Sequence, residues 1–355
     1  MTIKRRNTRQ IKVGDVLIGG NSPITVQSMT NTITKNINST VEQIKKLEKA
    51  GCDIIRFAVN DFDDAAAIGL IKKNINIPTI SDIQFDYKLA LAACENGIDG
   101  MRINPGNIGS KWKVKEVVEA CKDKGISIRV GVNSGSIKQE VLDKFGGVNE
   151  NSIVMSALEE IEILESLNFT DIKVSLKASN VNLSLEAYRK FSKLSNYPLH
   201  LGITEAGPPP IGIVKSSVGI GALLAEGIGD TIRVSLTADP LEEVTVGKEI
   251  LKSLGLRNEG VDLISCPTCA RTKVNLIELV EEAQKKLVDL DMNIKVAMMG
   301  CAVNGPGEAK EADIGVACGK GNGLIFKKGE IIKKVPEENL LNELFLEIEK
   351  MKNNK

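Results

Sequence analysis

The chain has 355 residues, more than the roughly 250–300 residues that one hydrophobic core usually serves, so two domains are expected. Lysine plus arginine and aspartate plus glutamate both number 46, and this balance argues against nucleic-acid and membrane-surface partners. No apolar run reaches the roughly 20 residues of a spanning helix, and the basic N-terminus lacks a following apolar segment. We therefore expect neither a membrane span nor a secretory signal.

Cysteine and histidine usage limits both the compartment and the chemistry. Seven cysteines without a signal segment favour the reducing cytoplasm over a disulfide framework. Cys52, Cys94 and Cys121 lie in apolar patterns and are interpreted as buried core thiols. His200 is the one histidine of the sequence, so acid–base chemistry must rest mainly on carboxylates or lysines, and a histidine-rich zinc site is excluded.

Residues 11–20 alternate around Gly14 and predict a small hairpin, after which short apolar runs alternate with amphipathic helical segments. The runs that we interpret as strands are 24–27, 54–59, 77–82, 100–104, 127–132, 172–177, 199–204 and 231–236. Strand–helix units repeated eight times over about 250 residues predict an α/β fold, a (β/α)8 barrel of the TIM type. A doubly wound open sheet is the alternative, but no Gly-x-Gly-x-x-Gly motif follows the first strand.

A polar, glycine-flanked segment at 255–260 marks a boundary, and we place the two domains at 1–257 and 258–355. The second part contains predicted strands at 261–265, 294–299 and 313–317, with a helix that ends near residue 290. A hairpin at 324–335 and a charged amphipathic helix from Pro336 complete it. This pattern predicts a smaller C-terminal α+β domain.

Polar or charged residues end nearly every predicted barrel strand, and in TIM barrels the strand ends form the active-site face. These residues are Arg56, Asp82, Arg102, Asn104, Arg129, Asn133, Lys177, Glu205 and Ser235. Arginines and a lysine that converge on one mouth repel one another unless an anion is bound. Because the planar guanidinium group suits phosphate, a substrate with two phosphates is inferred, with ordinary surface salt bridges as the alternative.

Glu205 is the carboxylate at the end of the seventh predicted strand, and it is the best acid–base candidate where histidine is so scarce. A simple ion pair between Glu205 and a barrel arginine is the alternative. Lys173 and Arg233 lie earlier in their strands, and His200 lies at the start of its strand. We interpret these last three residues as structural.

Three cysteines of the second domain follow two predicted strands, in Cys266-Pro-Thr-Cys269 and at Cys301. Cys-x-x-Cys pairs occur in zinc ribbons and thioredoxin-like sites as well as in iron–sulfur proteins. The βαβ order of thioredoxin is missing, and zinc would need four closed ligands. The spacing therefore favours an iron–sulfur cluster on three cysteines with a weaker fourth ligand. Glu308 and Cys318 are the candidates, and Glu308 as a solvated loop residue stays open.

Motifs spread over almost the whole chain resemble the 4-hydroxy-3-methylbut-2-enyl diphosphate synthase family, bacterial enzymes of the non-mevalonate isoprenoid pathway. The motifs are 26–30, 102–107, 129–135, 175–179, 200–207, 226–231, 233–236, 266–269 and 300–308. The chain departs from the family at 207–210 and lacks the extra middle domain of the plant-type enzymes. Neither departure touches a motif residue that carries chemistry.

The resemblance implies an oxidoreductase that opens the ring of 2-C-methyl-D-erythritol 2,4-cyclodiphosphate and releases 4-hydroxy-3-methylbut-2-enyl diphosphate and water. Two electrons would pass through a 4Fe–4S cluster, with Cys266, Cys269, Cys301 and Glu308 as its implied ligands. Glu205 matches the proton donor of the family. The implied substrate contacts are Arg56, Arg102, Asn104, Arg129, Asn133, Lys177 and Ser235.

The resemblance also implies a cytoplasmic homodimer whose active site is completed in trans, with flavodoxin or ferredoxin as the electron donor. Two other functions remain as alternatives. One is a non-redox barrel enzyme for phosphorylated substrates with a structural zinc module. The other is a non-catalytic iron–sulfur sensor whose barrel binds a ligand.

Overall fold

The computed structural model describes residues 3–288, 290, 292–301 and 309–353. The chain divides into two compact units, Met1–Arg257 and Asn258–Lys355, and each is described by itself. Within the described part of the chain, no helix is long and apolar enough to cross a membrane.

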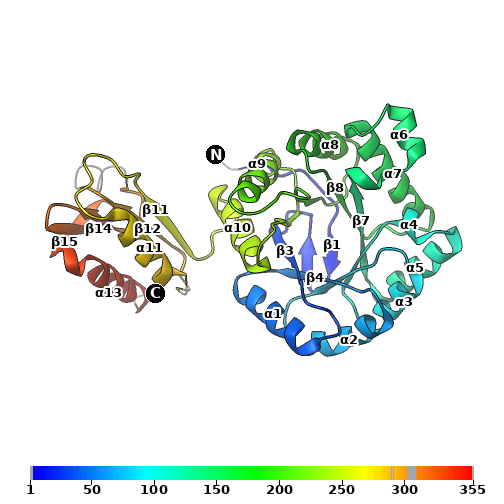
Figure 1. Cartoon of the computed structure of the whole chain (residues 1–355), viewed down its shortest axis with the longest axis horizontal. Helices are drawn as coiled ribbons and strands as arrows, with labels where there is room; N and C mark the ends of the chain where they lie inside the picture. Colours follow the sequence, from blue (N-terminus) through cyan, green and yellow to red (C-terminus); the bar gives the residue numbers. More distant parts are fainter. Residues whose placement is uncertain (1–2, 289, 291, 302–308, 354–355) are drawn as a thin grey trace. The chain divides into compact units, whose positions relative to one another are not determined.

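The first unit is a parallel β-barrel surrounded by helices (Figure 1). Its strands are β3 (Thr25–Met29), β4 (Ile54–Ala58), β5 (Thr79–Asp82), β6 (Gly100–Ile103), β7 (Ser127–Asn133), β8 (Ile172–Lys177), β9 (His200–Leu201) and β10 (Thr231–Ile232). They are hydrogen-bonded in the order β8-β7-β6-β5-β4-β3-β10-β9, and a parallel bridge from Val174 to Leu199 joins the two ends of this order. The structure thus confirms the predicted (β/α)8 barrel and excludes the open sheet.

The barrel helices begin where the sequence supplies capping residues. They are α1 (Ile37–Lys49), α2 (Phe62–Lys72), α3 (Tyr87–Glu95), α4 (Pro105–Ile108), α5 (Lys111–Lys124), α6 (Gln139–Phe145), α7 (Glu150–Ser166), α8 (Val181–Leu194), α9 (Ile211–Ala225) and α10 (Pro240–Ser253). The side chains of Asp61, Asn180 and Asp239 accept hydrogen bonds from backbone N–H groups in the first turns of α2, α8 and α10. Gly125 ends α5 in the left-handed conformation that favours glycine.

An apolar hairpin lies against the N-terminal ends of the barrel strands. Strands β1 (Ile11–Val13) and β2 (Val16–Ile18) pair antiparallel, as the sequence predicted. Ile11, Val13 and Ile18 are buried and form one cluster with Ile54 of β4 and Ile80 of β5. This cluster closes the barrel interior beneath β4 and β5, and in TIM barrels the chemistry lies at the opposite end, where the strands terminate.

Strands β9 and β10 are shorter than the sequence predicted. Pairing ends at Leu201 and Ile232, whereas the apolar pattern runs on through Ile203 and Val234. Both of these side chains are buried, each with 1% of its surface exposed. The pattern therefore reports burial of side chains, which continues here after the regular backbone ladder has stopped.

The second unit is a five-stranded mixed sheet with its own apolar core. Its strands lie in chain order as β11 (Val261–Ser265), β12 (Ile294–Met299), β13 (Ile314–Cys318), β14 (Asn322–Lys327) and β15 (Glu330–Pro336). The first three are parallel, and β14–β15 is the predicted antiparallel hairpin. Helices α11 (Leu276–Leu287) and α13 (Leu340–Asn353) contribute Ala283 and Leu344 to the core. Because α11 connects the parallel strands β11 and β12, this segment is a βαβ unit, and the prediction that a βαβ order is missing here was wrong.

Candidate active site

A polar cavity of about 260 Å³ lies at the C-terminal ends of the barrel strands. It is lined by residues at the ends of β4 to β8 and just after β5, β9 and β10: Arg56, Asp82, Gln84, Arg102, Arg129, Gly131, Asn133, Ser175, Lys177, Thr204, Arg233 and Ser235. This is the face on which TIM-barrel enzymes carry their chemistry.

The cavity gathers most of the side chains that the sequence singled out as substrate contacts. Arg56, Arg102, Arg129, Asn133, Lys177 and Ser235 all line it. Asn104 stands apart, because its side-chain oxygen accepts a hydrogen bond from Gly106 N–H at 3.0 Å and thereby caps α4. Glu205 follows the lining residue Thr204, but its own side chain is exposed, and its φ of +54° marks a tight turn.

Arg233 also lines the cavity, which its interpretation as a structural residue earlier in the strand did not predict. Strand β10 ends at Ile232, and Arg233 therefore stands at a strand end rather than within a strand. Its guanidinium group pairs with Glu243 of α10 at 3.4 Å, and Glu243 also accepts a hydrogen bond from Leu236 N–H at 2.9 Å. Gln84 is another lining residue that the sequence did not indicate, because it follows its strand by two positions.

Asp82 is the shared counter-ion of two arginines, the buried Arg56 and the half-buried Arg102. Arg102 Nη1 donates a hydrogen bond to Asp82 Oδ1 at 3.0 Å, and Arg56 Nη1 lies 3.5 Å from Asp82 Oδ2. Burial on its own would raise the pKa of Asp82, but the charges of Arg56 and Arg102 outweigh it and lower that pKa. Asp82 therefore stays ionised and holds the two guanidinium groups in place.

Cations nevertheless outnumber carboxylates in this cavity. Arg56, Arg102, Arg129, Lys177 and Arg233 line it together with a single acidic residue, Asp82. Burial and then the neighbouring arginines lower the pKa of Arg129 and of Lys177. Within the described residues, Arg129 Nε and Nη1 and Arg56 Nε have no hydrogen-bond partner. Buried, unpaired donors of this kind are costly unless a multiply charged anion occupies the site, and a diphosphate has the required charge and acceptors.

Two glycines make room for the cationic side chains. A Cβ atom on Gly202 would lie 2.7 Å from the Arg233 carbonyl oxygen and 2.8 Å from Lys177 Nζ. A Cβ atom on Gly131 would lie 3.1 Å from Ser175 Oγ and 3.5 Å from Arg102 Nε. The ammonium group of Lys177 thus lies directly over the backbone of Gly202, where any larger residue would displace it.

The second unit places the cysteine motifs on neighbouring loops. Strands β11 and β12 are parallel, with Ser265 beside Met298, so their C-terminal ends adjoin. Gly300 N–H donates a hydrogen bond to Cys266 Sγ at 3.2 Å, and Lys273 N–H donates to Gly300 O at 3.1 Å. The segment from Cys266 to Lys273 therefore packs against the start of the Cys301 loop.

The cysteines of these loops are free thiols with different environments. Cys269 is exposed, Cys266 is half-buried and Cys301 is buried. Such soft donors on adjacent turns suit an iron–sulfur cluster in their chemistry. Within the described part of the chain, however, no three acidic, cysteine or histidine side chains already converge on one metal position. The predicted ligand Glu308 lies outside the described residues.

The remaining cysteines are buried, as predicted for Cys52, Cys94 and Cys121. Burial raises the pKa of Cys52 to about 12. Cys318, the other candidate for a fourth ligand, belongs to the apolar core, and burial together with the nearby Glu337 raises its pKa to about 12. A thiolate is therefore harder to form at Cys318 than at an exposed cysteine.

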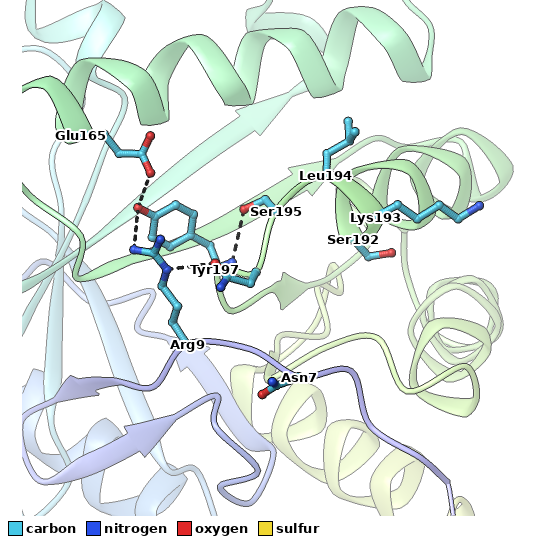
Figure 2. Close-up of a pocket in the computed structure, with 9 residues that line it drawn as sticks. Asn7, Arg9, Glu165, Ser192, Lys193, Leu194, Ser195 and Tyr197 are labelled. Carbon is cyan, nitrogen blue, oxygen red and sulfur yellow. Dashed lines mark hydrogen bonds between the residues drawn. The ribbon is translucent and has the colours of Figure 1, made fainter.

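A larger hollow of about 470 Å³ lies at the other end of the barrel, before β9 (Figure 2). Arg9 Nη1 donates a hydrogen bond to the Tyr197 hydroxyl at 3.3 Å, and this hydroxyl donates to Glu165 at 2.7 Å. Arg9 Nε donates to Asn196 at 2.9 Å, and its guanidinium carbon lies 4.6 Å from the Tyr197 ring centroid. These groups satisfy one another, and in TIM barrels this end contributes stability rather than chemistry.

Comparison with known proteins agrees with this division of the chain. The model of the GcpE TIM-barrel domain matches residues 8–248, and that of the GcpE protein C-terminal domain matches residues 262–350. A protein of Clostridium perfringens named 4-hydroxy-3-methylbut-2-en-1-yl diphosphate synthase (flavodoxin) is 59% identical over 98% of this chain and 99% of that protein. The protein of the same name from Clostridium tetani is 60% identical over 97% of this chain and 99% of its own length.

Solved structures with distant sequences share the barrel alone. Dihydropteroate synthase of Yersinia pestis superposes with a TM-score of 0.51 at 11% identity, over 69% of this chain and 98% of that chain. Type I 3-dehydroquinate dehydratase of Clostridium difficile gives a TM-score of 0.51 at 14% identity, over 70% of this chain and 97% of that chain. At these identities the likeness concerns the fold.

Proposed function

This chain belongs to the GcpE family, and we propose that it reduces 2-C-methyl-D-erythritol 2,4-cyclodiphosphate to 4-hydroxy-3-methylbut-2-en-1-yl diphosphate and water. It is an oxidoreductase that consumes two electrons in each turnover. The observation that carries the proposal is the cation-lined cavity at the barrel mouth, since this substrate brings two linked phosphates.

The barrel binds and orients the substrate. Arg56, Arg102 and Arg129 hold the phosphate oxygens, with Lys177 fixed over Gly202 as a further point charge. Asn133 and Ser235 supply neutral hydrogen-bonding groups on the rim of the same cavity. Fixed cations around the diphosphate stabilise the negative charge that it gains when the ring opens, and they restrict the geometry of the reacting carbons. Asn104 acts on the site indirectly through its cap on α4.

Proton delivery is assigned to Glu205. The departing hydroxyl must gain a proton to leave as water, and Asp82, the carboxylate among the described lining residues, is kept ionised by Arg56 and Arg102. Glu205 directly follows the lining residue Thr204 in the chain, in a tight turn beside the cavity wall. In this role Glu205 holds the proton on a carboxyl oxygen until the hydroxyl leaves.

The electrons require a group that the barrel lacks. Cys266, Cys269, Cys301 and Glu308 would hold a 4Fe–4S cluster, which supplies single electrons to the substrate when bound. The soft thiols suit iron, and the Gly300 N–H hydrogen bond to Cys266 Sγ is of a type that tunes such sites. A carboxylate as the fourth ligand is harder and more easily displaced than a thiolate.

We also propose an electron donor, an oligomeric state and a cellular compartment for this protein. Flavodoxin, named in the relatives, is the proposed electron donor, and ferredoxin is the alternative. We propose a homodimer in which the C-terminal unit of one chain serves the barrel of the other. The free thiols fit the reducing cytoplasm as its location.

An anaerobic assay tests the proposal. Purified protein with reconstituted cluster and a chemical reductant should convert the cyclodiphosphate to the linear diphosphate, which is followed by ³¹P NMR. One bound zinc and no acid-labile sulfide would instead indicate the non-redox enzyme with a zinc module. Substrate binding without any product would indicate the sensor.

Mixed subunits of Glu205→Gln and Cys301→Ser should recover partial activity if the site is built in trans, and no recovery from proven heterodimers would exclude that arrangement.

A further inference from the structure

The barrel interior beneath the cavity contains a lysine that the mechanism does not use. Lys173 lies on β8, four residues before Lys177, which corresponds to about 13 Å along the strand. Its side chain is 1% exposed, and Lys173 does not belong to the cavity lining. Among the residues that the structure describes, its Nζ has no hydrogen-bond partner. Lys173 therefore cannot touch a substrate, and its burial is not explained by a salt bridge.

Among the described residues, the charged groups that act on Lys173 are arginines. Arg129 of β7 is its partner in the strand register, and Arg56 of β4 acts on it electrostatically. His200 of β9 is buried in the same field, with its Nδ1 3.4 Å from Thr231 Oγ1 and its Nε2 without a partner among the described residues. Lys177, four residues further along β8, acts electrostatically on His200. The one lining carboxylate, Asp82, is already engaged by Arg56 and Arg102.

A crowded set of cations can lower its energy by releasing a proton, and the lysines are the groups that can do so. Arginine keeps its proton in proteins, whereas a buried lysine readily becomes neutral. Burial lowers the pKa of Lys173, and the charges of Arg129 and Arg56 lower it further. Burial, followed by the charges of Lys177 and Arg129, also lowers the pKa of His200, which keeps that ring neutral.

We propose that Lys173 is a positioning residue whose amine is uncharged in the empty barrel and gains a proton from solvent when a diphosphate binds above it. The bound anion compensates the positive charge, so the ammonium form becomes the stable one. A neutral amine can accept a hydrogen bond, whereas an ammonium group only donates and repels the neighbouring guanidinium group of Arg129. Protonation of Lys173 thus directs Arg129 toward the phosphates and links substrate binding to proton uptake.

The size of the effect follows from Coulomb's law. A unit negative charge about 10 Å away, at an effective dielectric constant of about 20, raises the proton affinity of an amine by roughly tenfold. A diphosphate with two charges raises it by roughly a hundredfold on the same scale. Such a change is enough to convert a mostly neutral lysine into a mostly charged one near neutral pH.

Calorimetry of the full-length protein tests the linkage. The cyclodiphosphate is titrated into anaerobic, cluster-reconstituted protein without reductant at pH 7.5, in buffers of different ionisation enthalpy, which yields the number of protons taken up. The cyclodiphosphate is suitable because both of its phosphates are esterified and do not titrate near this pH. Wild type should take up about one proton, Lys173→Met close to none, and the control His200→Asn the same number as wild type. The affinity of wild type should fall by up to tenfold per pH unit toward alkaline pH, with a flatter profile for Lys173→Met.

Several results would overturn the assignment. Absence of proton uptake by wild type would show that Lys173 does not change its charge on binding. Equal uptake by wild type and Lys173→Met would assign the proton to Lys177, and loss of uptake in His200→Asn alone would assign it to the histidine. Lys173→Gln repeats the measurement with a polar side chain, so the test does not depend on one variant.

The inference rests on the proposed function only in requiring a diphosphate ligand, and inorganic diphosphate serves as an independent probe. Because bound diphosphate also titrates, its difference in proton uptake between wild type and Lys173→Met is compared with that of the cyclodiphosphate, and agreement of the two assigns the proton to the lysine. If that difference is about one proton but the cyclodiphosphate is not turned over, the linkage stands and the proposed function fails. If turnover occurs with no difference in proton uptake, the linkage fails and the proposed function stands.

Discussion

Asp82→Asn is the sharpest test of the electrostatic design of the cavity. The Asp82 carboxylate is 9% exposed and lies 3.0 Å from Arg102 Nη1 and 3.5 Å from Arg56 Nη1. Asparagine keeps the shape and one acceptor but removes the charge, so two buried guanidinium groups lose their counter-ion. Disruption of a buried ion pair costs about 3–5 kcal/mol, and we expect about 3 kcal/mol because the Arg102 hydrogen bond can persist in weaker form.

Urea unfolding followed by tryptophan fluorescence measures this loss in the barrel alone. Trp112 is the single tryptophan of the chain, and it lies on α5 against Tyr87, with ring centroids 5.3 Å apart. Glu42→Gln is the matched control, because Glu42 pairs with Lys46 on an exposed helix face, and no measurable change is expected there. Inorganic diphosphate at saturation should reduce the Asp82→Asn deficit, since the anion replaces the missing negative charge.

The difference in unfolding free energy between wild type and Asp82→Asn should depend on pH in a defined way. The pKa of Asp82 is lowered in the folded state, so its contribution is fully present above the unfolded value of about 3.9. That contribution is lost as the pH falls through the folded-state pKa. The gap between wild type and Asp82→Asn should therefore be constant near neutral pH and close only in acid. A gap below about 0.5 kcal/mol at pH 7 would refute the view that Asp82 holds the arginines in place.

Three further variants address the other parts of the proposed site. Gly202→Ala should displace Lys177 and weaken cyclodiphosphate binding by about tenfold, or about 1.4 kcal/mol. Gly135→Ala is the control, because nothing lies within 4 Å of a Cβ atom at that position. Equal affinities of the two variants would contradict the placement of Lys177. Glu205→Gln should keep cluster and substrate binding but lose most turnover, by roughly 10²–10⁴-fold, and unchanged turnover would remove its acid role. Cys301→Ser should lose the iron–sulfur absorption, while the fluorescence of Trp112 should still show a folded barrel, because the two units have separate cores. Unfolding of the barrel together with the C-terminal unit would contradict the independence of the two cores.

The barrel was predictable from the sequence because its evidence is periodic and local. Short apolar runs, intervening helical patterns and polar strand ends required no knowledge of which strands pair. The positions of individual side chains did require it. Arg233 could be placed at the mouth only once β10 was seen to end at Ile232, and Asn104 occupies a strand end yet points its amide at the next helix.

The cysteine motifs were recognisable in the sequence, but the contact between their loops was not. Spacing alone singled out Cys266, Cys269 and Cys301. Their proximity depends on the parallel pairing of β11 with β12, which brings Gly300 to the sulfur of Cys266. Strand order within a mixed sheet is a long-range property, so no local pattern in either motif could have shown this contact.

The cavity also explains why substrate binding should stabilise the barrel. The empty site confines an excess of buried cations, several of whose N–H groups have no partner among the described residues. An anion that binds only the folded barrel adds RT ln(1 + [L]/Kd) to its stability, which is about 2.7 kcal/mol at a hundredfold excess over Kd. The apolar hairpin cluster under the opposite end supplies stability without a ligand. This cluster offsets part of the unfavourable electrostatic energy of the cation-lined mouth, and the excess positive charge there favours a multiply charged anion as the ligand.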